Sequence, residues 1–73
     1  RFDLPETGQV QLIVYDIMGR EVLRLIDELI PAGYHQAYWD GRDATGRQAA
    51  TGIYFARLVT LEYTKAMKML LLK

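Results

Sequence analysis

Apolar and polar residues alternate with a period of two along most of this 73-residue chain. Turn-forming residues interrupt the alternation about every eight to twelve positions, a spacing typical of sandwiches built from short strands. The pattern is clearest at Val10, Leu12 and Val14, which point to one face of a strand while Gln9 and Gln11 point to the other. No segment requires a helix. The sequence therefore predicts an all-β fold, a small antiparallel β-sandwich.

The expected strands are separated by clear turn signals and occupy residues 10–15, 20–26, 34–39, 53–60 and 65–72. Asp16 and Gly19 reverse the chain between the first two, because aspartate bonds its own backbone and glycine accepts a positive φ. The second arm is apolar on both faces, and Val22, Leu25 and Ile26 also fit a helical stripe. A helix is therefore the alternative to the strand that we favour there.

The chain is short enough to hold one domain, over residues 1–73, and it contains no cysteine. At this length folding buries only about 60% of the surface, so we expect modest stability and a contribution from outside the chain. Nine basic and nine acidic side chains cancel. Because no net field favours phosphate, nucleic acid is not an expected partner.

The sequence shows neither a membrane-spanning run nor an N-terminal export signal. The longest apolar run, residues 69–72, is far shorter than the about 20 residues that span a bilayer. The first residues lack a charged segment followed by an apolar stretch. Because the chain begins at Arg1 without methionine, we interpret it as a fragment or a processed C-terminal module.

His35 is the single histidine, and the chain has neither cysteine nor serine to act beside it. Catalysis or zinc binding requires such partners. We therefore predict a structural imidazole, no catalytic residue, no cofactor and no enzymatic activity.

Asp40 and Asp43, with Asp16 nearby, could offer oxygen ligands to calcium, which takes about six to eight of them. Their spacing lacks the regular carboxylate positions of a calcium loop. Aspartates beside glycine more often shape turns through bonds to the backbone, and we favour that role over calcium.

Trp39 and Tyr54 are the aromatic residues most readily assigned to the core. A sandwich packs large aromatic rings between its sheets and uses a tyrosine hydroxyl to hold a neighbouring loop. We favour packing over stacking against a ligand.

The last expected strand is apolar on both faces, whereas one face of a sandwich strand normally meets solvent. Met67, Met69 and Leu71 share one face, and Ala66, Leu70 and Leu72 share the other. Exposed apolar surface commonly marks an interaction site. Covering by the chain's own loops is the alternative. The predicted partner surface comprises Met67, Met69, Leu70, Leu71, Leu72 and Lys73.

A series of short motifs runs in a fixed order from Leu4 almost to the end of the chain. It includes VYD and GR at residues 14–16 and 19–20, AGYH at 32–35, WDG at 39–41 and TGIYF at 51–55. In this order the chain resembles the immunoglobulin-like C-terminal domain shared by type IX secretion sorting domains and the FlgD-type flagellar hook-cap protein. The signature positions are Tyr15, Asp16, Gly19, Trp39, Asp40, Gly41, Gly46, Gly52 and Tyr54.

The resemblance implies an immunoglobulin or fibronectin III-like sandwich of about seven strands, without activity of its own. Such domains begin with a strand upstream of the point where this chain starts, so we expect a missing or truncated first strand and an uncovered sheet edge. They also turn on glycine before the last strand. Residues 59–64 contain no glycine, which predicts a looser hairpin with Leu61 and Tyr63 on the surface.

Three functions follow from these features. The first is a secreted module for secretion, sorting and surface attachment, with the export machinery or a passenger domain as protein partner. The second is a structural subunit that forms an extracellular filament, a homo-polymer, by edge-strand pairing. The third is an accessory domain of a flagellar hook cap or a secreted hydrolase.

Overall fold

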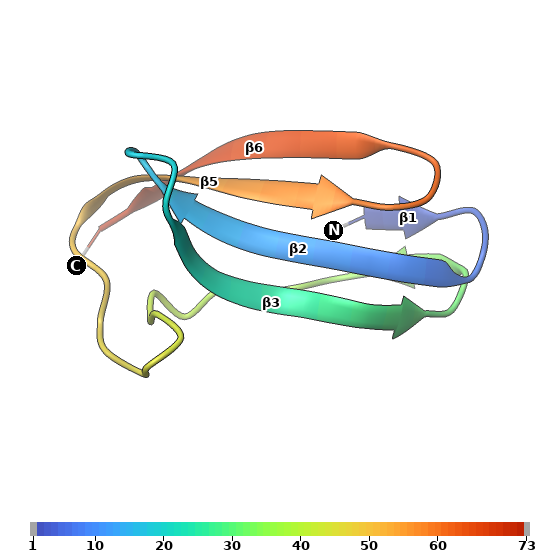
Figure 1. Cartoon of the computed structure of the whole chain (residues 1–73), viewed down its shortest axis with the longest axis horizontal. Coiled ribbons are helices and arrows are strands. Elements are labelled where there is room, and N and C mark those ends of the chain that lie inside the picture. Colours follow the sequence, from blue (N-terminus) through green and yellow to red (C-terminus); the bar gives the residue numbers. More distant parts are fainter. Residues whose placement is uncertain (1, 73) are drawn as a thin grey trace.

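The computed structural model describes residues 2–72, which form six β-strands and no helix (Figure 1). The strands are β1 (Phe2–Leu4), β2 (Gly8–Asp16), β3 (Glu21–Ile30), β4 (Gly33–His35), β5 (Gly52–Val59) and β6 (Thr64–Leu71). Within these residues no helix is long and apolar enough to cross a membrane.

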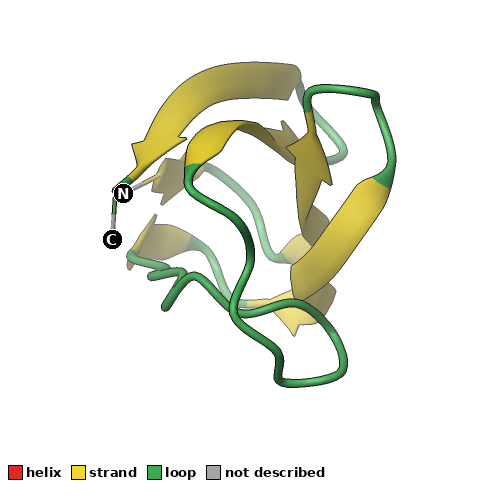
Figure 2. Cartoon of the chain, turned by 90° about the vertical axis from the view of Figure 1, so that its left-hand side faces the viewer, coloured by secondary structure: helices red, strands yellow, loops and turns green. Residues whose placement is uncertain are grey.

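The strands form two antiparallel sheets. The larger has the order β3-β2-β5-β6, and the smaller contains β1 and β4 alone. Figure 2 looks along the strands from the end where the β2–β3 turn and the long connection between β4 and β5 lie. The predicted all-β sandwich is confirmed, with a second sheet much smaller than the first.

The core lies between the sheets, on the face predicted from the alternation in β2. Val10 and Val14 are fully buried, and Leu12 is 7% exposed. Leu4 of β1 and Ala56 and Leu58 of β5 complete the central cluster. A period of two thus supplies one buried row from each central strand.

Residues 20–26, for which helix was the alternative, belong to the longer strand β3. Its pairing with β2 shifts register between Leu12 and Ile13 and again between Val14 and Tyr15. Each extra residue at a bulge turns the following side chains to the other face. These shifts explain why apolar residues occur on both faces of this arm and mimic a helical stripe.

The strand expected at residues 34–39 ends at His35, so this prediction was too long by four residues. β4 pairs only with β1, whose three residues meet Gly33, Tyr34 and His35. Among the described residues the β1–β4 ladder ends at the Phe2–His35 pair, and the chain then runs to Thr51 as an irregular segment.

The β5–β6 hairpin closes tightly although it lacks glycine. The amide of Thr60 donates to the Tyr63 carbonyl at 2.9 Å, and the Thr60 hydroxyl accepts from the amides of Glu62 and Tyr63 at 3.1 and 3.0 Å. A hydroxyl can hold a turn in place of glycine in this way. Leu61 is 75% exposed as expected, but Tyr63 is half-buried, and its predicted surface position was wrong.

Candidate interaction surface

The signature residues Trp39 and Tyr54 form one aromatic contact. Their rings meet edge to face, with centroids 4.9 Å apart and an interplanar angle of 67°. The Trp39 indole donates to the Arg42 carbonyl at 2.8 Å, and the Tyr54 hydroxyl donates to the Ala50 carbonyl at 2.6 Å. Both polar groups are therefore used to hold the 36–51 segment against β5.

Asp43 organises the same segment from within. One carboxylate oxygen accepts from the amides of Thr45 and Arg47 and from the Thr45 hydroxyl, at 2.9, 3.1 and 2.7 Å. These donors, led by the Thr45 hydroxyl, lower the pKa of Asp43. Asp40 accepts from the Arg42 amide at 3.1 Å, and Gly46 donates to the Asp43 carbonyl. The two aspartates thus act as turn acceptors.

Asp16 holds the β2–β3 turn in a similar way. Its carboxylate accepts from the amides of Met18 and Arg20, both at 2.9 Å, and pairs with the Arg20 guanidinium at 3.0 Å. The Arg20 amide, the strongest influence, lowers the pKa of Asp16. Gly19 completes the turn by donating to the Asp16 carbonyl at 3.0 Å.

The three aspartates considered for calcium do not converge. Asp16 and Asp43 line one shallow recess of about 470 Å³, where their oxygens are already bonded to the turns that carry them. Asp40 does not line that recess. Across residues 2–72 no three acidic or histidine side chains gather in a way that could hold a metal ion.

His35 is the last residue of β4, in the smaller sheet. Its ring stacks on Phe2 at 5.4 Å, and Nε2 lies 2.6 Å from the Pro31 carbonyl. A carbonyl only accepts, so Nε2 carries the proton in this contact. The imidazole thereby connects β1 to the turn that precedes β4.

Gly41 links the signature segment to β6. It is buried, with φ of 82°, and a Cβ atom there would lie 3.2 Å from a methyl carbon of Leu71. Glycine is needed both for the left-handed backbone and for the close approach. Gly52 begins β5 opposite Leu71, and Tyr15 lies on β2 opposite Phe55.

β6 is an edge strand with two different faces. Met67 and Met69 lie opposite Ala56 and Tyr54, on the side that faces the core, and Leu70 lies opposite Ile53 on the outer side. Met69 packs on the core and Leu71 on Gly41, so this part of the predicted partner surface is half-buried. Met67, Leu70 and Leu72 are 45%, 65% and 73% exposed. Lys73 lies outside the described residues.

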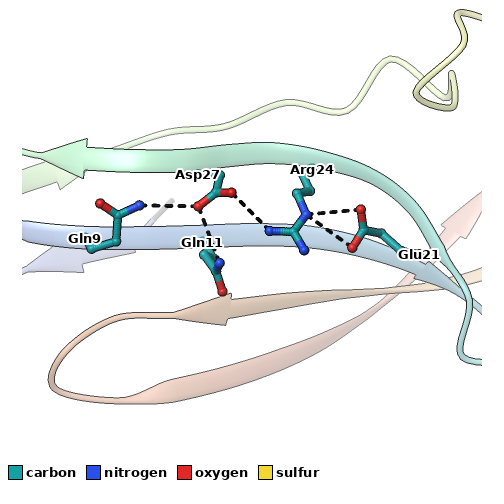
Figure 3. A network of polar contacts seen from close by, with 5 residues as sticks. All are labelled: Gln9, Gln11, Glu21, Arg24 and Asp27. Carbon is teal, nitrogen blue, oxygen red and sulfur yellow. Dashed lines mark hydrogen bonds and ion pairs between the residues drawn. The ribbon is translucent and has the colours of Figure 1, made fainter.

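The other edge of the same sheet, β3, carries a polar network on its outer side (Figure 3). Arg24 pairs with Glu21 and Asp27 at 3.1 and 3.0 Å, and Asp27 also accepts from Gln9 and Gln11 at 3.3 and 3.4 Å. Hydrogen bonds to Glu21 and, to a lesser extent, to Asp27 raise the pKa of Arg24. Hydrogen bonds from Gln11 and, to a lesser extent, from Arg24 lower the pKa of Asp27. Charge covers this edge.

An apolar cavity of about 510 Å³ lies between β1 and β6. Phe2 and Asp3 line it from β1, Met67 and Met69 from β6, and Leu12 and Ala56 from the floor of the larger sheet. At one end the Tyr63 hydroxyl donates to the Asp3 carbonyl at 2.8 Å and joins the β5–β6 turn to β1. The sandwich is therefore incompletely filled along this side.

Neither the cavity nor the Tyr63–Asp3 bond was predicted. The bond joins residues 60 positions apart, and nothing local to either residue announces it. The sequence feature that could have indicated the cavity is the expected loss of the first strand, which leaves a sheet edge uncovered. In residues 2–72 no strand other than β4 pairs with β1.

Comparison with known proteins gives one family. A family model described as FlgD Ig-like domain matches residues 1–65. No curated protein and no solved structure matches the chain.

Proposed function

Because the chain belongs to the FlgD Ig-like domain family, we propose that it is a non-catalytic C-terminal module of a secreted bacterial protein. It acts outside the cell in secretion, sorting and surface attachment, through contact with another protein. The observation that carries this proposal is β6, an apolar edge strand whose Leu70 is 65% exposed, with Leu72 just beyond it 73% exposed.

Three features support a contact role. The Trp39 indole, the Tyr54 hydroxyl and the carboxylates of Asp16 and Asp40 are already hydrogen-bonded within the domain. On the outer side of β6 and just beyond it, Ala66, Leu70 and Leu72 are exposed beside Lys68. Exposed apolar patches of this kind mark protein interaction sites. A sheet edge adds backbone donors and acceptors for a partner strand.

An export assay tests the proposal. A reporter enzyme fused to residues 1–73 is expressed in a bacterium with a type IX secretion system, and reporter activity is measured in the medium and on the cell surface. We expect export of the fusion, and loss of most of it with the double substitution Leu70→Gln and Leu72→Gln. Removal of β6 is unsuitable, because Met69 packs on the core.

Leu29→Gln in β3 is the matched control, because Leu29 is 67% exposed on the opposite edge of the same sheet. Circular dichroism checks that each variant folds. Equal export of the fusion and of the reporter alone would overturn the proposal. Equal loss from the β3 and β6 variants would remove β6 as the contact surface.

The second candidate is an accessory domain of a flagellar hook cap or of a secreted hydrolase, and the family description favours the hook cap. The residues encoded before Arg1 test it. A hook-cap or hydrolase region there supports this candidate, and an adhesive region favours the first proposal.

A further inference from the structure

β6 differs from β3 in two of the features that normally prevent a sheet edge from pairing, bulges and charge. Edge strands are usually blocked by charge, by bulges or by being short. β3 has two register shifts and four charged residues among ten. β6 pairs with β5 without a register shift over all eight residues, from Gly52–Leu71 to Val59–Thr64, and carries two lysines. Its outer edge can therefore accept another strand.

The apolar cavity lies beside this edge. Met67 and Met69 form its β6 side, and Met67 is 45% exposed. A strand added to β6 would continue the sheet and place alternate side chains over the cavity mouth. The added strand should therefore be apolar on the cavity side. Methionine suits such a position, because its flexible side chain fills irregular space.

β6 itself meets this requirement, and its sequence is self-complementary in the antiparallel direction. With a two-fold axis at Met69, Met67 lies opposite Leu71 of the second copy on the cavity side. Lys68 lies opposite Leu70 of the second copy, and Ala66 opposite Leu72, on the outer side. Among residues 66–72 of the two copies this register opposes no like charges, which would be destabilising; Lys65 and Lys73 would be opposite only outside that stretch.

Two neighbouring registers are less favourable. An axis at Lys68 places that lysine opposite its own copy. An axis at Met67 places Lys65 opposite Met69 on the cavity side and Leu71 opposite Tyr63, which lies in the β5–β6 turn rather than in β6. The axis at Met69 keeps the two lysines of β6 apart from their copies and places Met67–Leu71 and Met69–Met69 pairs over the cavity.

We infer that β6 pairs antiparallel with β6 of a second copy across a two-fold axis at Met69, and that each copy covers the other's apolar cavity. The same patch serves both copies, so the assembly closes as a dimer rather than growing into a filament. Like the proposed function, the inference rests on β6 being an open edge. It concerns contact between copies of this chain and needs no export machinery.

Sedimentation of residues 1–73 over a wide concentration range tests the dimer. We expect a mass that approaches twice 8.4 kDa as concentration rises. Leu70→Lys creates two Lys–Lys pairs across the axis and should weaken association about tenfold. Leu70→Glu creates two Lys–Glu pairs and should associate at least as tightly as the unchanged chain.

Leu29→Lys and Leu29→Glu, on the β3 edge, are matched controls that should leave association unchanged. Melting at low concentration shows whether the monomers fold, and hydrogen exchange of the β6 amides supplies a second readout. We expect added protection of β6 at high concentration only. A monomer at every concentration, an open-ended polymer, or equal effects of Leu70→Lys and Leu70→Glu would overturn the inference. Export of the reporter is scored separately, so either proposal can fail alone.

Discussion

The two edge strands of the larger sheet, β3 and β6, are similar in length and opposite in character. β3 has ten residues, two register shifts and a network that joins Arg24 to Glu21 and Asp27. β6 has eight residues, a regular ladder and three consecutive apolar side chains at its C-terminal end, Met69, Leu70 and Leu71. The charge and register shifts of β3 favour an edge in contact with solvent, whereas the regular, apolar end of β6 favours pairing with another strand.

This difference shows how one sheet of a small sandwich can have a charged edge that stays in solvent and an apolar edge that is available for contact. Surface ion pairs such as those of Arg24 contribute little to stability. Their effect at the β3 edge is to keep strands from other molecules away. The apolar residues of β6 have the reverse effect, because they improve the core from one side and expose apolar surface on the other.

The largest expected effect on stability comes from the side of β6 that packs on the core. Met69→Ala removes a side chain that packs on the central cluster and should destabilise the domain by about 1–2 kcal/mol. Leu29→Ala, at a position 67% exposed on β3, should change the free energy of unfolding by no more than about 0.5 kcal/mol. Urea denaturation at low protein concentration measures both. Equal losses would contradict the distinction between the edges.

A smaller effect is expected where β6 is joined to β1. Tyr63→Phe removes the hydroxyl that donates to the Asp3 carbonyl and should cost about 1 kcal/mol. Tyr38→Phe is the control, because its hydroxyl bonds Gln36 from a side chain 82% exposed, and its loss should be close to neutral. If the two variants unfold alike in urea, the Tyr63–Asp3 bond does not hold the cavity end together.

The smallest expected effect concerns acid. Hydrogen bonds from Gln11 and, to a lesser extent, from Arg24 lower the pKa of Asp27 from its ordinary value of 3.8. The folded state therefore favours the ionised carboxylate of Asp27. This stabilisation is present above pH 3.8 and is lost as pH falls through 3.8 toward the lower folded pKa. Asp27→Asn should therefore flatten the fall in stability on acidification.

Lys68→Gln in β6 is the control for this measurement, since β6 contains no carboxylate. Denaturation is followed from neutral pH to below 3.8. A decline that is as steep in Asp27→Asn as in the unchanged chain would show that the β3 network does not contribute to acid sensitivity.

Much of the fold could be predicted from local patterns. The buried row of Val10, Leu12 and Val14 follows from a period of two, and the Asp16–Gly19 turn follows from the chemistry of its end residues. Both depend on residues close in sequence. The strand at residues 34–39 was overestimated, because its length depended on β1, a partner distant in sequence.

The surface was predicted only in part for the same reason. The two apolar faces of the last strand were visible in the sequence, and Leu70 and Leu72 are exposed. Met69 and Leu71 turned out to be half-buried, because the core cluster and Gly41 lie beneath them. In a strand that is apolar on both faces, alternation shows which residues share a face, but not which of the two faces meets the core.

The sequence by itself determined the class of fold, the approximate positions of β2 to β6 and the family, because alternation, turn chemistry and ordered motifs are local properties of the chain. Tertiary structure alone decided that β3 and β6 are the edges, that Tyr63 reaches Asp3, and that an apolar cavity lies beside β6. These features arise from pairing between distant segments. Whether an apolar strand becomes core or contact surface depends on which neighbours that pairing places beside it.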